Sequence, residues 1–132
     1  MENNKLLSRE DFKRLVFERS NGKCCVPNCR EDAVDAHHII ERHLFSDNGY
    51  YLSNGAGLCA KHHLDAEKGI ISPKELLEIN NINKDDIVVP DSLSLSREDY
   101  IELLYNGELD KWGELVETKP YDEHWFEKFK KS

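Results

Sequence analysis

The sequence lacks any long run of apolar residues. No stretch approaches the roughly 18 residues that a membrane-spanning helix requires, so a membrane protein is not expected. The first ten residues, MENNKLLSRE, also lack the apolar segment of a secretory signal peptide, which predicts a cytoplasmic protein. Internal repeats and low-complexity segments are absent as well, which argues against a repeat architecture.

Basic charge is scarce. Lys and Arg number 18 against 26 Asp and Glu, and the formal net charge is −8. Because DNA repels an acidic surface, the total charge argues against nucleic-acid binding. The excess acid lies after residue 70, however, since residues 71–127 hold five basic and fifteen acidic residues. Five of the six histidines precede residue 70. We expect residues 71–127 to face away from DNA, and either to cover the first half or to bind a protein partner.

The composition is otherwise that of a globular protein. The 132 residues suffice for one domain and are too few for two large ones. Apolar residues make up 39% and charged residues 33%, which excludes a disordered chain and a collagen.

Capping and turn residues predict an α+β fold. Helices are expected over about 9–20, 58–68, 73–79 and 96–105, each with a capping, proline or glycine signal near one end. Strands are expected over 33–40 and 86–89, a tight turn over 23–31 and a long loop over 41–57. The aromatic-rich tail after Gly107 is expected to pack on the body, with its tryptophans buried.

All four cysteines lie in the half of the chain that contains most histidines. In a cytoplasmic chain this clustering favours a metal site over disulfides. The spacings Cys24-x4-Cys29 and Cys59-x2-His62 predict a tetrahedral structural zinc site, which would add stability that a small core lacks. Cys25 is an alternative to Cys24, because Cys25-x3-Cys29 is also short enough.

A second group of residues predicts a catalytic metal. His37 and His38 are neighbours on a predicted strand and point to opposite faces, so one can bind a metal while the other activates water. Neighbours on a helix differ by about 100°, so His62 can face the zinc while His63 faces the second metal. Glu67 lies four residues after His63 on the same helix face and is a further candidate ligand.

These motifs resemble the HNH nuclease (ββα-metal) family. The match covers roughly residues 23–69, and the related branch carries Cys-x2-Pro-x-Cys, which selects Cys24 over Cys25. The resemblance rests on three segments in order and one residue between them: Cys24-Cys25-Val26-Pro27-Asn28-Cys29, Asp35-Ala36-His37-His38-Ile39, Asn54, and Leu58-Cys59-Ala60-Lys61-His62-His63.

The resemblance implies a domain layout. It implies a small ββα-metal core stabilised by a structural zinc. This core and the helix before it occupy residues 1–70. An acidic, mainly helical extension over 71–132 is expected to pack on that core. The residues that match the family's zinc set are Cys24, Cys29, Cys59 and His62.

The resemblance also implies the roles of the other residues. His38 matches the general base, and His37 and His63 match ligands of the catalytic divalent metal. Asn54 matches the residue that orients the base through the loop backbone. Glu67 replaces a histidine that related sequences often carry. As a ligand it would favour Mg²⁺ or Mn²⁺ over Ni²⁺ or Zn²⁺, whereas the alternative is a solvated carboxylate.

The implied activity is metal-dependent hydrolysis of phosphodiester bonds in DNA. Arg42, His43 and Lys61 flank the motif and could contact phosphates, although solvated surface charge explains them equally well. One alternative is a nuclease for RNA or structured nucleic acid, and another is a non-catalytic zinc module that binds a protein. A homodimer would suit double-strand cleavage, but no segment of the sequence points to an interface.

Overall fold

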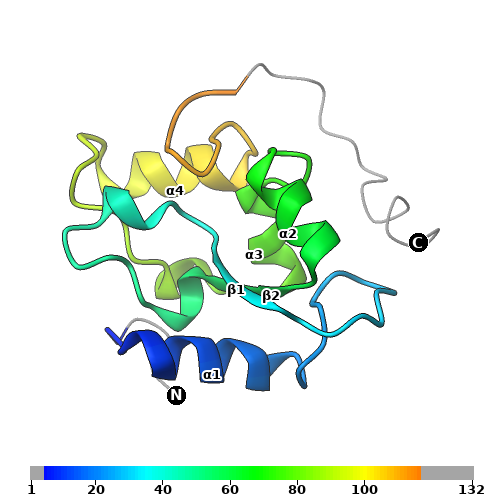
Figure 1. Cartoon of the computed structure of the whole chain (residues 1–132). Coiled ribbons are helices and arrows are strands. Elements are labelled where there is room, and N and C mark those ends of the chain that lie inside the picture. The colour runs from blue at the N-terminus through cyan, green and yellow to red at the C-terminus, as the bar shows by residue number, and fades with distance from the viewer. Residues whose placement is uncertain (1–4, 117–132) are drawn as a thin grey trace.

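The computed structural model describes residues 5–116, which form a small α+β fold (Figure 1). The described part contains four α-helices and one two-stranded antiparallel sheet. None of its helices combines the length and the apolar character needed to cross a membrane. In chain order the elements are α1 (Arg9–Arg19), β1 (Asp35–His38), β2 (Gly55–Leu58), α2 (Ala60–Glu67), α3 (Pro73–Ile79) and α4 (Arg97–Tyr105).

The helices begin within two residues of their predicted starts, where capping side chains satisfy their free N–H groups. Ser8, Ser72 and Ser96 each accept a hydrogen bond from the backbone N–H three residues later. The cap of α2 is Cys59, whose Sγ accepts from the N–H of His62 at 3.5 Å. The start of α2 and a candidate metal ligand are therefore the same residue.

The sheet lies between α1 on one face and α2 on the other (Figure 1). Strand β1 pairs with β2 so that Asp35 faces Leu58 and His38 faces Gly55. Helix α1 approaches β2 so closely that a Cβ on Gly55 would lie 2.4 Å from Val16 Cγ2. The Arg19 guanidinium also donates hydrogen bonds to the carbonyl oxygens of Leu52 and Gly55. These contacts fix α1 to the sheet.

Three predicted features differ from the structure. Strand β2 lies at the end of the segment predicted as a loop, because its Gly-Ala-Gly start carries no strand-forming side chains and pairs through its backbone. Residues 86–89 form no strand, since a short 3₁₀-helix, Lys84–Asp86, leads into irregular backbone. Trp112 is 46% exposed, because it lies on the turn between Leu109 and Leu115. The other tail aromatics, Tyr121, Trp125, Phe126 and Phe129, lie outside the described residues.

The main hydrophobic core draws on both sides of residue 70. Ile39 and Leu58 are buried in the same cluster as Leu76, Tyr100 and Leu104. A smaller cluster beneath α1 contains Phe12, Val16 and Leu52. The division into two domains at residue 70 stays a prediction, while the helices after residue 70 pack on the elements that carry the histidines.

Candidate functional site

Three cysteines and a histidine converge at one end of α2. Their ligand atoms all lie within 4.8 Å of one another. His62 Nδ1 is 3.2 Å from Cys59 Sγ and 3.4 Å from Cys24 Sγ, and Cys29 Sγ is 4.0 Å from Cys59 Sγ. A tetrahedral zinc with bonds of about 2.0–2.3 Å separates its ligand atoms by about 3.5–3.8 Å. The cluster could therefore hold a structural zinc.

A tight turn brings two of these cysteines together. The N–H of Cys29 donates to the carbonyl of Val26 at 3.0 Å, with Asn28 in the left-handed region at φ 65°.

All four cysteines are described, and none forms a disulfide. Burial raises the pKa of the Cys24 thiol to about 12, so its thiolate requires a nearby cation. Cys25 lies outside the cluster, where its Sγ is 3.6 Å from Asn80 Nδ2.

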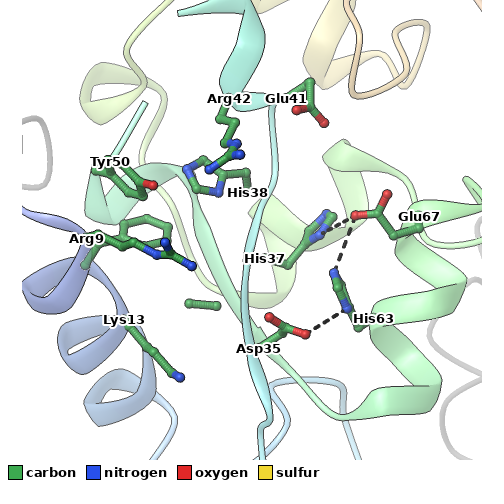
Figure 2. Close-up of a pocket in the computed structure, with 12 residues that line it drawn as sticks. Arg9, Lys13, Asp35, His37, His38, Glu41, Arg42, Tyr50, His63 and Glu67 are labelled. Carbon is green, nitrogen blue, oxygen red and sulfur yellow. Dashed lines mark ion pairs between the residues drawn. The ribbon is translucent and has the colours of Figure 1, made fainter. Parts of the chain in front are cut away.

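A second cluster joins His37 of β1 to His63 and Glu67 of α2. Glu67 Oε1 is 3.4 Å from His37 Nδ1 and 3.4 Å from His63 Nε2 (Figure 2). The other ring nitrogen of His63, Nδ1, lies 3.1 Å from Asp35 Oδ2. A carboxylate in that position orients a ligating imidazole. Two imidazole nitrogens and one carboxylate oxygen thus face a common point, and this set could hold a divalent cation.

His38 lies on the opposite face of β1 from His37, as strand alternation requires. Its ring stacks on Phe12 of α1 at 4.9 Å between centroids and meets Tyr50 edge-on at 5.1 Å. Its Nε2 is buried and has no hydrogen-bond partner among residues 5–116. A backbone hydrogen bond with Asn48 acts to raise the pKa of His38, against the larger lowering effect of burial. An unpaired buried nitrogen is costly and indicates a partner such as water or a ligand.

Asn54 holds the loop that contacts His38. Its Oδ1 accepts from the N–H of Ile40 at 2.8 Å, and its Nδ2 donates to the carbonyls of Ile40 at 3.0 Å and Gly49 at 3.3 Å. Gly49 directly follows Asn48, the backbone partner of His38. The amide therefore joins the end of β1 to the loop segment that orients the imidazole.

Burial keeps both strand histidines neutral at neutral pH. It lowers the pKa of His37 to about 4 and that of His38 to about 4. For Glu67, burial acts to raise the pKa, but the hydrogen bond and charge of Lys111, together with the two imidazoles, outweigh it and the net shift is downward. A neutral imidazole can accept a proton or bind a cation, and a charged carboxylate can share that cation.

One pocket of about 370 Å³ adjoins both strand histidines. Arg9 and Lys13 of α1 reach it from one side, and Arg42 reaches it from the segment after β1 (Figure 2). Among the described residues, these three cations form no ion pair. His43 and Lys61 do not line the pocket. His43 is exposed and pairs at 2.7 Å with Glu41, which does line it, and Lys61 is exposed on α2.

Sequence reasoning missed four residues of this site. Arg9 and Lys13 are four residues apart on the first helix, and this spacing could have indicated a basic face. Asp35 precedes His37 by two residues on a strand, which places both on one face. Lys111, whose Nζ is 2.5 Å from Glu67 Oε2, carries no local signal, because tertiary packing alone brings it there.

Comparisons with protein-family models, with curated proteins and with solved structures give no match for this chain. The side chains described above are therefore the only basis for inferring its function.

Proposed function

We propose that the chain is a metal-dependent HNH endonuclease that hydrolyses phosphodiester bonds in DNA. The observation that carries the proposal is the position of His38, a neutral imidazole with an unpaired buried Nε2. It adjoins the same pocket as His37, His63 and Glu67, whose ligand atoms converge. A zinc module that served only as a scaffold would need neither this base nor the second ligand set.

The donor chemistry of the second cluster fits a divalent cation. His37 and His63 offer neutral nitrogens and Glu67 offers a charged oxygen, a combination suited to Mn²⁺ and, through its carboxylate, to Mg²⁺. A cation bound there would supply charge stabilisation to the phosphate in the transition state. Asp35 would keep His63 in the tautomer that presents Nε2 to the cluster.

His38 would act as the general base. Its Nε2 would take the proton from the attacking water, while the Asn48 backbone and the Asn54 amide hold the ring and its loop. The stacking contact with Phe12 restricts the ring further, so little reorganisation is needed when the proton moves.

The substrate class is tested by incubating the purified chain with supercoiled plasmid, single-stranded DNA and RNA. Each reaction contains Mg²⁺, Mn²⁺ or Ni²⁺, and each is repeated with the His38→Ala variant. We expect Mg²⁺- or Mn²⁺-dependent nicking or cleavage of plasmid that the variant lacks. Cleavage confined to RNA would select the RNA-nuclease alternative. No cleavage of any substrate, with zinc bound, would favour the non-catalytic zinc module.

Arg9 and Lys13 are predicted to contact substrate phosphates. Replacing both with alanine should raise KM for duplex DNA several-fold with a smaller effect on kcat. It should also reduce the slope of log affinity against log salt by about 2, since each lost phosphate contact removes about 1. Arg14→Ala is the matched control, because Arg14 lies on the same helix but pairs with Asp11 and Glu18 outside the pocket. Equal effects of the two replacements would contradict this prediction.

A further inference from the structure

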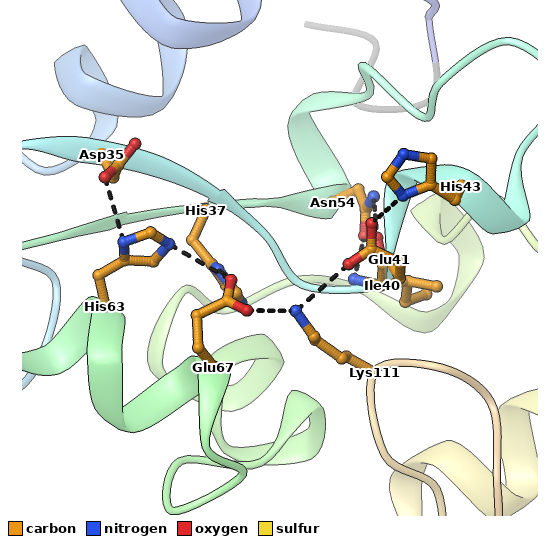
Figure 3. A network of polar contacts seen from close by, with 9 residues as sticks. All are labelled: Asp35, His37, Ile40, Glu41, His43, Asn54, His63, Glu67 and Lys111. Atoms are coloured by element: carbon orange, nitrogen blue, oxygen red, sulfur yellow. Dashed lines mark hydrogen bonds and ion pairs between the residues drawn. The ribbon is translucent and has the colours of Figure 1, made fainter.

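Lys111 reaches the second cluster from the segment that follows α4. Its Nζ lies 2.5 Å from Glu67 Oε2 and 3.2 Å from Glu41 Oε2 (Figure 3). Its carbonyl oxygen accepts a hydrogen bond from the N–H of Glu41 at 2.9 Å. The side chain is 13% exposed, so backbone and side-chain contacts together fix the ammonium in place.

The two oxygens of Glu67 face different neighbours. Oε1 faces His37 Nδ1 and His63 Nε2, whereas Oε2 faces the ammonium of Lys111. A glutamate side chain on a helix surface otherwise samples several rotamers, and ordering it costs free energy. The ammonium therefore preorganises the carboxylate with one oxygen toward the imidazoles and the other occupied.

Glu41 balances the charge that Lys111 brings. The ammonium lies between two carboxylates, so the group of Glu41, Lys111 and Glu67 carries one net negative charge. A divalent cation at the cluster thus meets a negative neighbourhood despite the nearby lysine. Because Glu41 balances the charge of Lys111, the main effect of Lys111 on the cluster is to orient the Glu67 carboxylate.

We infer that Lys111 is a positioning residue that restricts Glu67 to coordination of a divalent cation through one oxygen. This inference rests on the proposed function for the assignment of the second cluster as a metal site. Single-oxygen coordination suits small octahedral cations such as Mg²⁺ and Mn²⁺, whereas Ca²⁺ readily accepts both oxygens of a carboxylate. The segment after α4 thereby contributes to the metal selectivity of a site built on β1 and α2.

The test measures cation binding by the full zinc-loaded chain in the absence of nucleic acid. In Lys111→Met, calorimetry or Mn²⁺ electron paramagnetic resonance should show about tenfold weaker Mn²⁺ binding, a typical effect of removing such an outer partner. Ca²⁺ binding should weaken less, so the ratio of the two affinities shifts toward Ca²⁺. Lys111→Arg should restore most of the Mn²⁺ affinity, because a guanidinium can donate to both carboxylates.

Two controls separate positioning from a general structural effect. Lys74→Met removes a similarly buried lysine, 2.6 Å from Glu78 on α3, and should leave Mn²⁺ binding unchanged. In a Glu67→Gln background, Lys111→Met should cause little further loss of Mn²⁺ affinity, because the carboxylate it positions is already absent. Zinc content should match wild type in every variant.

Several results would overturn the inference. These are unchanged or tighter Mn²⁺ binding in Lys111→Met, an undiminished effect in the Glu67→Gln background, or no Mn²⁺ binding by the wild-type chain. A different set of results would contradict the proposed function but not this inference. In that case wild type binds Mn²⁺ and Lys111→Met weakens it as expected, yet no nucleic acid is cleaved.

Discussion

His38→Ala is expected to reduce phosphodiester cleavage by about 10²- to 10⁴-fold, the contribution typical of a positioned general base. The variant should still bind zinc and the second cation, because His38 belongs to neither cluster. The ring stacks on Phe12 at the edge of the smaller core, so we expect only a modest decrease in Tm. Single-turnover cleavage of plasmid at saturating Mg²⁺ measures the chemical step directly.

His43→Ala is the matched control for that experiment. It removes a nearby histidine that is exposed and does not line the pocket, although its partner Glu41 does, so its cleavage rate should be close to that of wild type. Cleavage by His38→Ala at the wild-type rate would reject the assignment of the base. Loss of the cooperative unfolding transition in His38→Ala would show instead that the residue is structural.

Cys59→Ser is expected to abolish zinc binding at the Cys₃His cluster and to lower the stability of the chain. Structural zinc in small modules binds with an apparent free energy of about 10–16 kcal/mol at neutral pH. Cys59 Sγ is 3.2 Å from His62 Nδ1, so the substitution removes a candidate zinc ligand. Cys59 also caps α2, but a serine hydroxyl can take over that role, so the loss of stability comes from the zinc site. We expect Tm to fall by more than about 10 °C. Elemental analysis and thermal unfolding measure the two effects.

Cys25→Ser separates loss of a ligand from loss of any cysteine. Cys25 is the neighbour of Cys24, but its Sγ contacts Asn80 and lies outside the Cys₃His cluster. This variant should retain one zinc per chain and unfold within a few degrees of wild type. Retention of tightly held zinc by Cys59→Ser, or its loss from Cys25→Ser, would contradict the ligand assignment.

Local signals in the sequence predict the helices and the members of both the Cys₃His cluster and the second cluster. Ser8, Ser72 and Ser96 act within one turn of chain, so they can be interpreted without tertiary information. The separation of His62 from His63 follows from helix geometry in the same way, and the structure places them in different clusters.

Features that depend on packing could not be predicted in this way. Strand β2 begins with Gly55, which has a low strand propensity. The absence of a side chain there allows α1 to pack closely against the strand. Lys111 reaches Glu67 from 44 positions along the chain, because α3 and α4 fold back on the shared core. Arg9 of α1 and Arg42 of the segment after β1 line the same pocket. Nothing in the sequence around either residue predicts that the other lies nearby.

Because His62 and His63 are consecutive on α2, we expect cation binding at the two clusters to be interdependent. A cation that ties His62 to the turn containing Cys24 and Cys29 also sets the rotation of α2 about its own axis, and hence the direction of His63. Thermodynamic linkage makes such an effect reciprocal, so occupancy of either cluster should tighten the other. On the proposed function, zinc starvation would then suppress hydrolysis even where magnesium is plentiful.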